Sequence, residues 1–226
     1  MKKAYVYKMN LVPANLLGLV VFILLLVLTN VLKVNILPVF DKIPFIWILV
    51  LLMLYMILHE VLHGIGYRIT GTKTNKIKYG IELEKGILYT LVLEEVPKKN
   101  ILVSLQMPFV IIGIITLLLG YILNIPLLVL LSIFNLMGAS MDLVMFIYIS
   151  RIKDVHYAET KASDEFILIS KEDLTKIKSL FFKIIEVNNY KKEDYIVKSD
   201  KKITISKASI IFTIIYLIFG IIITLI

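Results

Sequence analysis

The sequence predicts an all-α membrane protein with about five transmembrane helices, a short cytoplasmic β-hairpin and a small cytoplasmic α/β loop region. Of its 226 residues 59% are hydrophobic, with a mean hydropathy of +0.89, whereas a soluble domain is roughly half apolar. The apolar residues are gathered in runs long enough for a helix to cross a bilayer, which needs about 20 residues. Lys and Arg are gathered in every second connecting segment, a pattern typical of multi-pass membrane proteins.

Five apolar runs are the predicted spans. They are residues 11–32, 44–66, 101–123, 126–150 and 208–226. The first run is too long for the apolar part of a signal peptide and lacks a small-residue cleavage site, so we expect it to be retained. Pro44 and Pro126 suit the first turns of the second and fourth helices. Pro108 lies inside the third run and predicts a kink there.

These spans divide the chain into four regions. Residues 1–43 form a first transmembrane anchor and loop, 44–155 a transmembrane core that carries the candidate metal ligands, 151–207 a basic cytoplasmic loop region, and 208–226 a C-terminal transmembrane helix.

The distribution of basic residues predicts the orientation. Of the 25 Lys and Arg residues, three precede the first span, seven lie in the second loop and thirteen in the fourth, which leaves two in the first loop. Because basic residues accumulate on the cytoplasmic side, we expect a multi-pass protein of the cell membrane with its N-terminus and its second and fourth loops in the cytoplasm. The net charge of +8 then favours anionic lipid headgroups as a partner and disfavours nucleic acid.

The two basic loops carry some secondary structure. In the second, residues 76–79 and 87–93 have strand-like composition with Gly80 and Gly86 as breaks, which favours a hairpin over a plain connector. In the fourth, Ser170 suits a helix N-cap. Apolar residues then follow at helical spacing: Leu174, Ile177, Leu180, Phe181, Ile184 and Ile185. We expect this helix to lie at the membrane interface or on short strands near 166–169 and 203–205.

The second span ends with the motif His59-Glu60-Val61-Leu62-His63. On a helix, His59 and His63 stand on one face, so both rings can reach one Zn²⁺, and Glu60 lies beside it where a carboxylate can take a proton from a bound water. A charge in the middle of a span costs about 2.5–3.5 kcal/mol on insertion scales, so these residues indicate a functional site. The chain has no cysteine, so His, Asp and Glu must supply the metal ligands.

Asp142 is the predicted third ligand. Besides Glu60 it is the one acidic residue within the five spans, and the second and fourth spans run in the same direction. It follows Pro126 by about as many residues as His59 follows Pro44, which puts both at similar depth at a rise of about 1.5 Å per residue. The alternative is a carboxylate bonded within the bundle. The rival ligands are His156, Asp154, Glu94 and Glu95 in the cytoplasmic loops.

Asn135 and Gly138 share a helical face with Asp142. Asn135 suits either a substrate contact or support for a metal ligand, and equally a plain hydrogen bond between helices. Gly138, with Ala139 and Ser140, predicts a close approach to a neighbouring helix.

At these residues the chain resembles a known family. His59–His63 near the end of a span, Gly80, Met107-Pro108-Phe109 and Gly138-Ala139-Ser140-Met141-Asp142 are similar to the bacterial zincin peptidase family of small membrane proteins, long catalogued as a domain of unknown function. That family is similar in plan to the site-2 proteases, intramembrane zinc enzymes with a histidine pair in one helix and an aspartate in a later one. The resemblance covers about 45–155; Asp142 lacks the glycine that follows it in site-2 proteases, and no PDZ-like segment is present.

The resulting hypothesis is a membrane zinc metalloprotease. Zn²⁺ on His59, His63 and Asp142 would activate water, with Glu60 as general base, against a membrane protein or peptide substrate. A non-catalytic zinc-binding regulatory or immunity protein and a metal transporter are the alternatives. The sequence names neither the substrate nor the oligomeric state.

Overall fold

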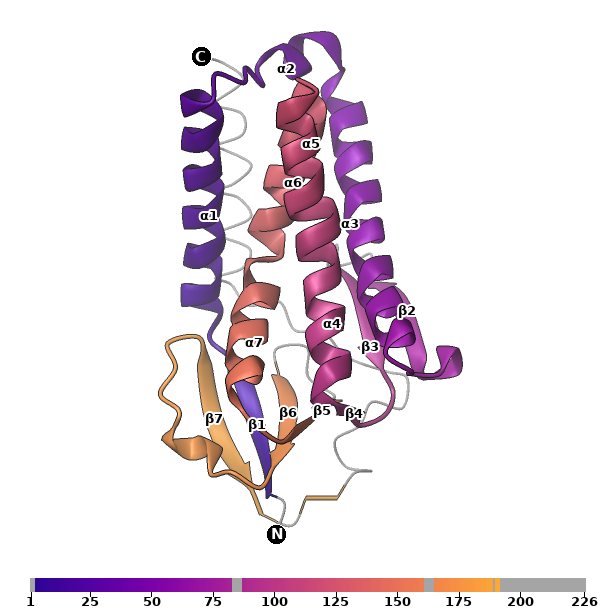
Figure 1. The fold of residues 1–226 in the computed structure, drawn as a ribbon, viewed down its shortest axis with the longest axis vertical. Helices are drawn as coiled ribbons and strands as arrows, with labels where there is room; N and C mark the ends of the chain where they lie inside the picture. The colour runs from indigo at the N-terminus through magenta and orange to yellow at the C-terminus, as the bar shows by residue number, and fades with distance from the viewer. Residues whose placement is uncertain (1–2, 83–86, 161–164, 189, 192–226) are drawn as a thin grey trace.

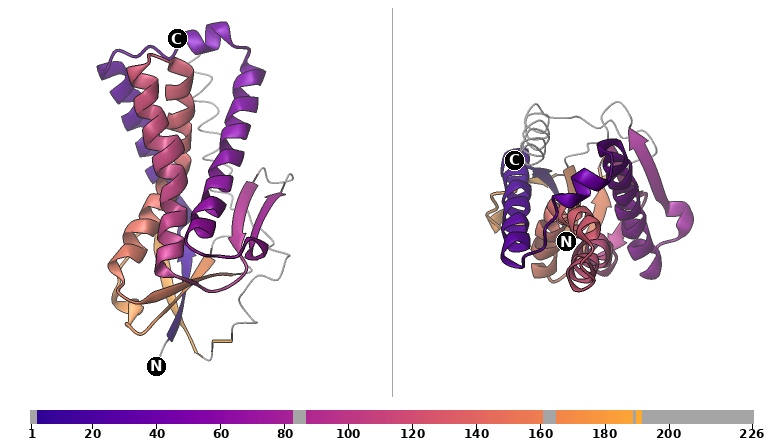
Figure 2. Two further views of the ribbon diagram at one scale, coloured as in Figure 1. Left: turned by 45° about the vertical axis from the view of Figure 1, so that its right-hand side comes forward. Right: turned by 90° about the horizontal axis from the view of Figure 1, so that it is seen from above.

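Apolar helices run side by side along the long axis of the molecule and stand on a β-sheet at one end (Figures 1 and 2). This computed structural model describes residues 3–82, 87–160, 165–188 and 190–191. The helices are α1 (Leu11–Val31), α2 (Pro38–Lys42), α3 (Phe45–Ile69), α4 (Lys98–Pro108), α5 (Thr116–Ile122), α6 (Pro126–Gly138) and α7 (Ser140–Arg151), with the π-helical segment η3 (Phe109–Ile115) between α4 and α5.

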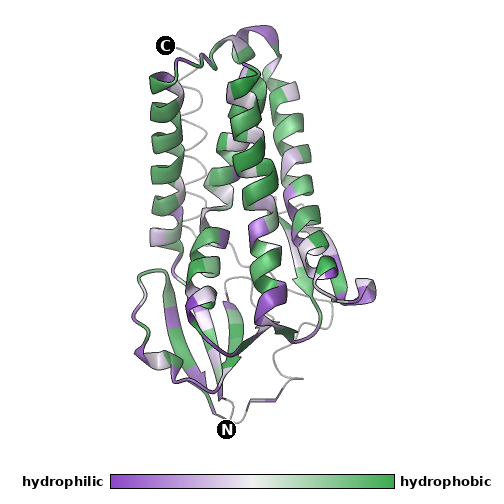
Figure 3. Ribbon diagram, viewed as in Figure 1, coloured by the Kyte–Doolittle hydropathy of each residue, from purple (hydrophilic) through white to green (hydrophobic). Residues whose placement is uncertain are grey.

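Three helices of the described residues are long and apolar enough to cross a membrane, or four if the bent pair α6 and α7 counts as one span. They are α1, α3 and the continuous stretch Lys98–Ile122. Their outward side chains are exposed and apolar, such as Val31, Trp47 and Ile122, and the ribbons of these helices are coloured mainly as hydrophobic in Figure 3. The protein is therefore membrane-associated. The fifth predicted span, 208–226, lies outside the described residues.

The helix interrupted by Pro108 changes its winding there. After α4 ends at Pro108, the backbone continues through η3 before α5 resumes the α-helix. A π-helical turn displaces backbone acceptors from their usual donors. The carbonyl of Ile112 accepts hydrogen bonds from the hydroxyls of Tyr55 (3.0 Å) and Thr116 (2.7 Å), and Thr116 also bonds Ser132 of α6 at 2.7 Å. This polar network joins three helices inside the apolar region.

The predicted continuous helix over 126–150 is wrong. It ends at Gly138 and restarts at Ser140, and the two halves, α6 and α7, meet at 48°. Sharp bends are typical of Gly and Ser pairs. The expected close approach at Gly138 is also wrong, because a Cβ there would have no neighbour within 4 Å. The small residues change the direction of the helix immediately before Asp142.

A five-stranded antiparallel sheet closes one end of the bundle, in the order β4-β5-β6-β1-β7. Its strands are β1 (Lys3–Met9), β4 (Val96–Pro97), β5 (Val155–Glu159), β6 (Glu165–Ser170) and β7 (Phe182–Val187). The N-terminal segment thus pairs with β6 on one side and β7 on the other, and leads directly into α1. The strand predicted near 166–169 is confirmed as β6, whereas the expected α/β region is a β-sheet that also includes the N-terminal segment, which was not predicted to be a strand.

The predicted helix after Ser170 is also wrong. Ser170 ends β6, a short 3₁₀ turn η4 (Leu174–Lys176) follows, and the rest of the segment becomes β7. β7 pairs with β1 over six residue pairs, and those backbone hydrogen bonds outweigh the local helical pattern of a sequence rich in β-branched and aromatic residues. The proposed strand near 203–205 lies outside the described residues.

The sheet and the helices share one core. Tyr5 and Tyr7 of β1 are fully buried in a cluster with Tyr67 of α3, Ile101 of α4 and Ile149 of α7. Lys98 at the start of α4 donates hydrogen bonds to the carbonyls of Ser150 and Ile152 at the end of α7. The inner ends of α3, α4 and α7 are therefore fixed on the sheet.

The predicted hairpin is confirmed. β2 (Ile77–Glu82) and β3 (Ile87–Val92) are antiparallel, with Ile77 opposite Val92. The hairpin lies beside α3 at the end of the molecule that carries the sheet (Figure 2). The hydroxyl of Thr90 in β3 donates to the backbone carbonyl of Glu60 at 2.7 Å, which ties the hairpin to the histidine motif.

We predict that Gly66→Ala destabilises the fold. Its Cβ would lie 2.6 Å from the backbone Cα of Ser104, so α3 and α4 must separate. Overpacking of this kind costs about 1–3 kcal/mol, a fall of roughly 2–10 °C in Tm, measurable by thermal unfolding in detergent. Gly138→Ala, which meets nothing within 4 Å, is the control. Equal Tm values for the two variants would contradict this packing.

Candidate metal centre

The two histidines of the motif face each other from adjacent turns of α3. The Nε2 atoms of His59 and His63 lie 3.0 Å apart. Both side chains are largely withdrawn from solvent, with 15% and 12% of their surface exposed. The helical spacing of four residues accounts for this arrangement.

Asp142, in the first turn of α7, completes the group. Its Oδ2 atom lies 3.2 Å from Nε2 of His59 and 3.5 Å from Nε2 of His63. The bend before Ser140 brings this turn of α7 toward α3. Three ligand atoms from two helices thus form a triangle whose sides are 3.0, 3.2 and 3.5 Å.

The hydrogen bonds on the far side of each ring fix its tautomer. Nδ1 of His59 lies 2.8 Å from Oδ1 of Asn135, and Nδ1 of His63 lies 2.9 Å from the carbonyl oxygen of Ser104. Both partners are acceptors, so each Nδ1 carries the proton and donates it. Each Nε2 then presents a lone pair toward the other and toward the Asp142 carboxylate, an arrangement that a cation between them stabilises.

This donor set fits zinc. Nitrogen and oxygen ligands bind Zn²⁺ at about 2.0–2.1 Å, so two ligands at tetrahedral corners lie about 3.3 Å apart. The three measured separations bracket that value. His59, His63 and Asp142 are the residues that would hold the ion, and a fourth position is left for water or substrate.

Pro108 supports both histidines. Because proline has no N–H, it cannot donate to the carbonyl of Ser104 four residues earlier in α4, and that carbonyl accepts the proton of His63. The carbonyl of Pro108 itself accepts a hydrogen bond from Nδ2 of Asn135 at 3.2 Å. That contact orients the amide so that its oxygen faces His59. The proline therefore shapes the environment of the ligands as well as the winding of the helix.

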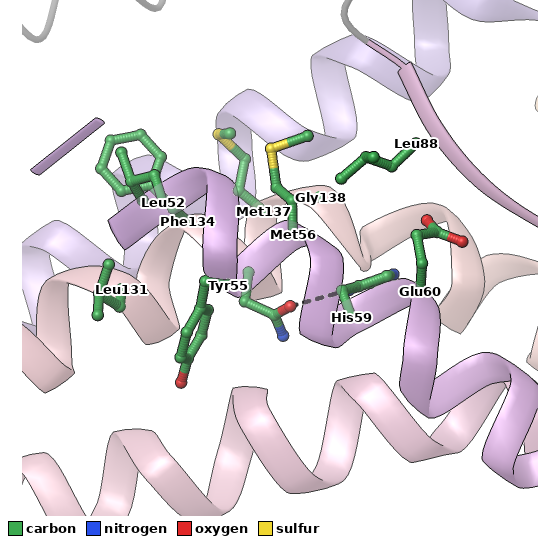
Figure 4. A pocket seen from close by; sticks show the side chains of 11 residues that line it. Leu52, Tyr55, Met56, His59, Glu60, Leu88, Leu131, Phe134, Met137 and Gly138 are labelled. Carbon is green, nitrogen blue, oxygen red and sulfur yellow. Dashed lines mark hydrogen bonds between the residues drawn. The ribbon is translucent and has the colours of Figure 1, made fainter. Parts of the chain in front are cut away.

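Glu60 lies at the side of this triangle. One of its carboxylate oxygens falls with the ligand nitrogens of the two histidines into a group whose atoms are all within 4.8 Å of one another. Figure 4 shows its side chain beside His59 and directed toward Leu88 of β3. A carboxylate here reaches a water held at the centre without displacing Asp142, which is closer to both imidazoles.

Two cavities meet at Glu60. The larger, about 360 Å³, lies on the side of the transmembrane region and is lined mainly by apolar side chains of α3 and α6 (Figure 4). The smaller, about 180 Å³, lies toward the sheet and reaches His63 and Asp142. Glu60 and Leu88 line both. A bound peptide that extended from one cavity into the other would pass next to the metal ligands.

The other predicted residues lie as follows. Gly138 lines the larger cavity together with Asn135, so a side chain at position 138 would project into open space. Among the rival ligands, His156 is in β5 opposite Pro97 of β4, and Glu95 accepts a hydrogen bond from Tyr190. In the part of the chain that the structure describes, the potential ligand atoms of His59, Glu60 and His63 all lie within 4.8 Å of one another.

Sequence reasoning missed several residues at the site. The backbone carbonyl of Ser104 accepts a hydrogen bond from His63, and the hydroxyl of Thr90 donates one to the backbone carbonyl of Glu60. Tyr157 and Glu159 of β5 line the smaller cavity. The position of Ser104 four residues before Pro108 is a signal that could have found it. The two β5 residues come to the site only through the folding of the sheet.

The helices and the site together indicate a membrane-associated protein with a candidate metal site of the HExxH type. Residues 51–157 match the model of a protein family described as "Putative zincin peptidase". This stretch holds both histidines, Glu60, Asn135 and Asp142, and the match is consistent with the family that the motifs of the chain resemble. No curated protein and no solved structure gives a significant match to the chain.

We predict that Asn135→Leu weakens zinc binding. It removes the acceptor that orients His59 and the donor to Pro108, and loss of such support typically costs about 10–100-fold in metal affinity. Zinc affinity is measured by chelator competition in detergent. Asn135→Asp, which keeps an acceptor for His59, should retain most of the affinity.

Ser132→Ala is the matched control for that experiment, because Ser132 is buried in the same helix and bonds Thr116 and the carbonyl of Leu128. Wild-type affinity in folded Asn135→Leu would show that the amide does not position the ligand.

Proposed function

We propose that the protein is a zinc metalloprotease embedded in the membrane, which hydrolyses peptide bonds of a membrane or membrane-proximal protein. The observation that carries the proposal is the convergence of His59, His63 and Asp142 within 3.5 Å, with Glu60 alongside and a cavity on either side. The HExxH group and the zincin family match support the same chemistry.

Zinc bound at this site lowers the pKa of a coordinated water and polarises a substrate carbonyl. The chain's own residues do the rest. Asn135 and Ser104 hold the imidazoles in the tautomer whose Nε2 is free to bind. Glu60 takes the proton from the water as it attacks, and returns that proton to the leaving amine. Its position in the lining of both cavities supports this role.

The substrate must present an extended segment, because the carbonyls of an intact helix are already hydrogen-bonded. Four consecutive residues of β3, Leu88 to Leu91, line the smaller cavity. Since successive residues of a strand point to opposite faces, an edge of β3 borders the cavity and not one face alone. We infer that the unwound substrate adds to β3 as a further strand, in the way many peptides bind exposed sheet edges.

The same proposal includes the orientation. The N-terminal strand, the hairpin and the sheet lie at one end of the molecule (Figure 1), and the segments that form them hold most of the 25 basic residues. By the positive-inside rule this end faces the cytoplasm, next to anionic lipid headgroups. The metal ligands lie where the helices meet the sheet, so water reaches them from that side.

We predict that Glu60→Gln abolishes hydrolysis and retains zinc. Glutamine has the same shape and cannot accept the proton, and loss of a general base typically lowers the rate by about 10²–10⁴-fold. The assay follows cleavage of quenched-fluorescence peptides with an apolar run in detergent micelles, alongside the zinc content of each sample.

Two outcomes of that assay, and one outcome of a separate transport measurement, contradict the proposal in different ways. A wild-type rate in Glu60→Gln excludes the general-base role. A zinc-loaded wild type without hydrolysis favours a non-catalytic zinc protein. Zinc flux through the wild type in proteoliposomes would favour a transporter.

A further inference from the structure

We propose that the larger cavity is a binding subsite for a large apolar side chain of the substrate, and that Gly138 sets the size of the side chain it admits. This inference rests on the proposed function and specifies the substrate: a membrane-embedded segment with an aromatic or long aliphatic residue next to the scissile bond. Gly138 thereby becomes a specificity-determining position that takes no part in holding the metal or in activating the water.

The cavity borders the candidate metal centre. Its volume is about 360 Å³, and its walls come from α3 and α6, with Leu88 of β3 beside them. His59 and Glu60 belong to the same lining. A substrate whose scissile bond lies at the metal can therefore place a neighbouring side chain in this cavity. The position favours a substrate side chain over a lipid chain as the occupant, because the substrate must reach the metal next to it.

The uncharged polar side chains of the lining, Tyr55 and Asn135, are already engaged within the protein. The hydroxyl of Tyr55 is hydrogen-bonded to a carbonyl and a hydroxyl of the stretch Lys98–Ile122. The amide of Asn135 accepts a hydrogen bond from His59 and donates one to the carbonyl of Pro108. A polar substrate group that entered the cavity would lose its hydration without gaining these partners, which is unfavourable. The cavity therefore selects apolar groups.

The rest of the lining suits a large and varied apolar side chain. It consists of Leu52, Met56, Leu88, Leu131, Phe134 and Met137, besides Gly138. The two methionines, drawn with yellow sulfur atoms in Figure 4, are flexible and make favourable contacts with aromatic rings. An apolar cavity of about 150 Å³ is enough to bind benzene. The larger cavity thus has room for the side chain of phenylalanine, leucine or methionine.

Gly138 leaves part of this space open. It is the last residue of α6 and lines the cavity, and a Cβ at this position would meet no atom within 4 Å. A helical backbone accepts any L-residue other than proline without strain. A larger side chain can therefore be placed at position 138 without moving the protein, and it takes up volume that glycine leaves to a ligand.

The test measures binding of the hydroxamates of Phe, Gln and Ala to zinc-loaded protein in detergent by isothermal titration calorimetry. The hydroxamate group chelates zinc at the open coordination position, so each compound holds its side chain next to the metal and needs no hydrolysis. We expect the Phe compound to bind the wild type about tenfold more tightly than the Ala compound, because it buries more apolar surface. The Gln compound should bind about as weakly as the Ala compound.

Two variants reduce the cavity from different walls. Gly138→Leu on α6 should weaken the Phe compound about tenfold and leave the Ala compound unchanged, and Met56→Trp on α3 should do the same. Met53→Trp is the matched control, because Met53 and Met56 are both 49% exposed on α3 and Met53 lies outside the lining. It should keep the wild-type values. Each ratio compares two compounds on one protein, and the zinc content of every variant is measured first.

Equal affinities of the Phe and Ala compounds for the wild type overturn the subsite, and are expected if a lipid acyl chain fills the cavity. A Phe preference that persists in both Gly138→Leu and Met56→Trp also overturns it. Peptide cleavage is measured separately on the same preparations. The subsite can therefore fail while peptides are cut, and the protease proposal can fail while the hydroxamates bind as expected.

Discussion

Two imidazole lone pairs and one carboxylate oxygen face each other at 3.0 to 3.5 Å where α3 meets α7. Such a group of largely buried side chains is unfavourable unless a cation lies at its centre, because three electron-rich atoms repel one another and solvent screens them little. Their convergence is the constraint on which the rest of the structure depends. A zinc ion bound there would turn this repulsion into a stabilising contact between two helices that are otherwise held by apolar packing.

The irregular features of the helices serve this group. Pro108 leaves the carbonyl of Ser104 to His63 and offers its own to Asn135, which orients His59. The bend between Gly138 and Ser140 brings Asp142 to the histidines. In a membrane, a broken helix is tolerated only where protein or a water-filled cavity satisfies its backbone. Here the interruptions of two different spans fall at the same site, which indicates that both serve to position the metal ligands.

The sequence predicted the elements that local patterns specify. Long apolar runs marked α1, α3 and the stretch Lys98–Ile122, and the alternation on either side of Gly80 and Gly86 marked the hairpin. Spacing and depth also put His59, His63 and Asp142 side by side, as they lie in the structure. These inferences succeed because each depends on a few neighbouring residues or on the fixed rise of a helix.

The rest depends on contacts between distant segments. β1 and β7 are strands because they pair with each other and with β6, and the isolated segment 174–185 has the periodicity of a helix. Glu159 lies at the site because β5 packs under α3 and α7, which a single sequence does not reveal. Small residues such as Gly138 allow either close helix packing or a bend in the helix, and the sequence does not distinguish the two. The structure shows a bend.

The most direct test of the metal centre is the zinc content of detergent-purified protein after incubation with excess zinc and removal of the unbound metal. The wild type should hold about one zinc per chain, and His59→Ala and Asp142→Ala should hold almost none, since three protein ligands are needed for a stable catalytic site. Glu159→Gln, which leaves all three ligands in place, should match the wild type. A wild type that binds no zinc, or an Asp142→Ala variant that retains it at full affinity, would contradict a site built from His59, His63 and Asp142.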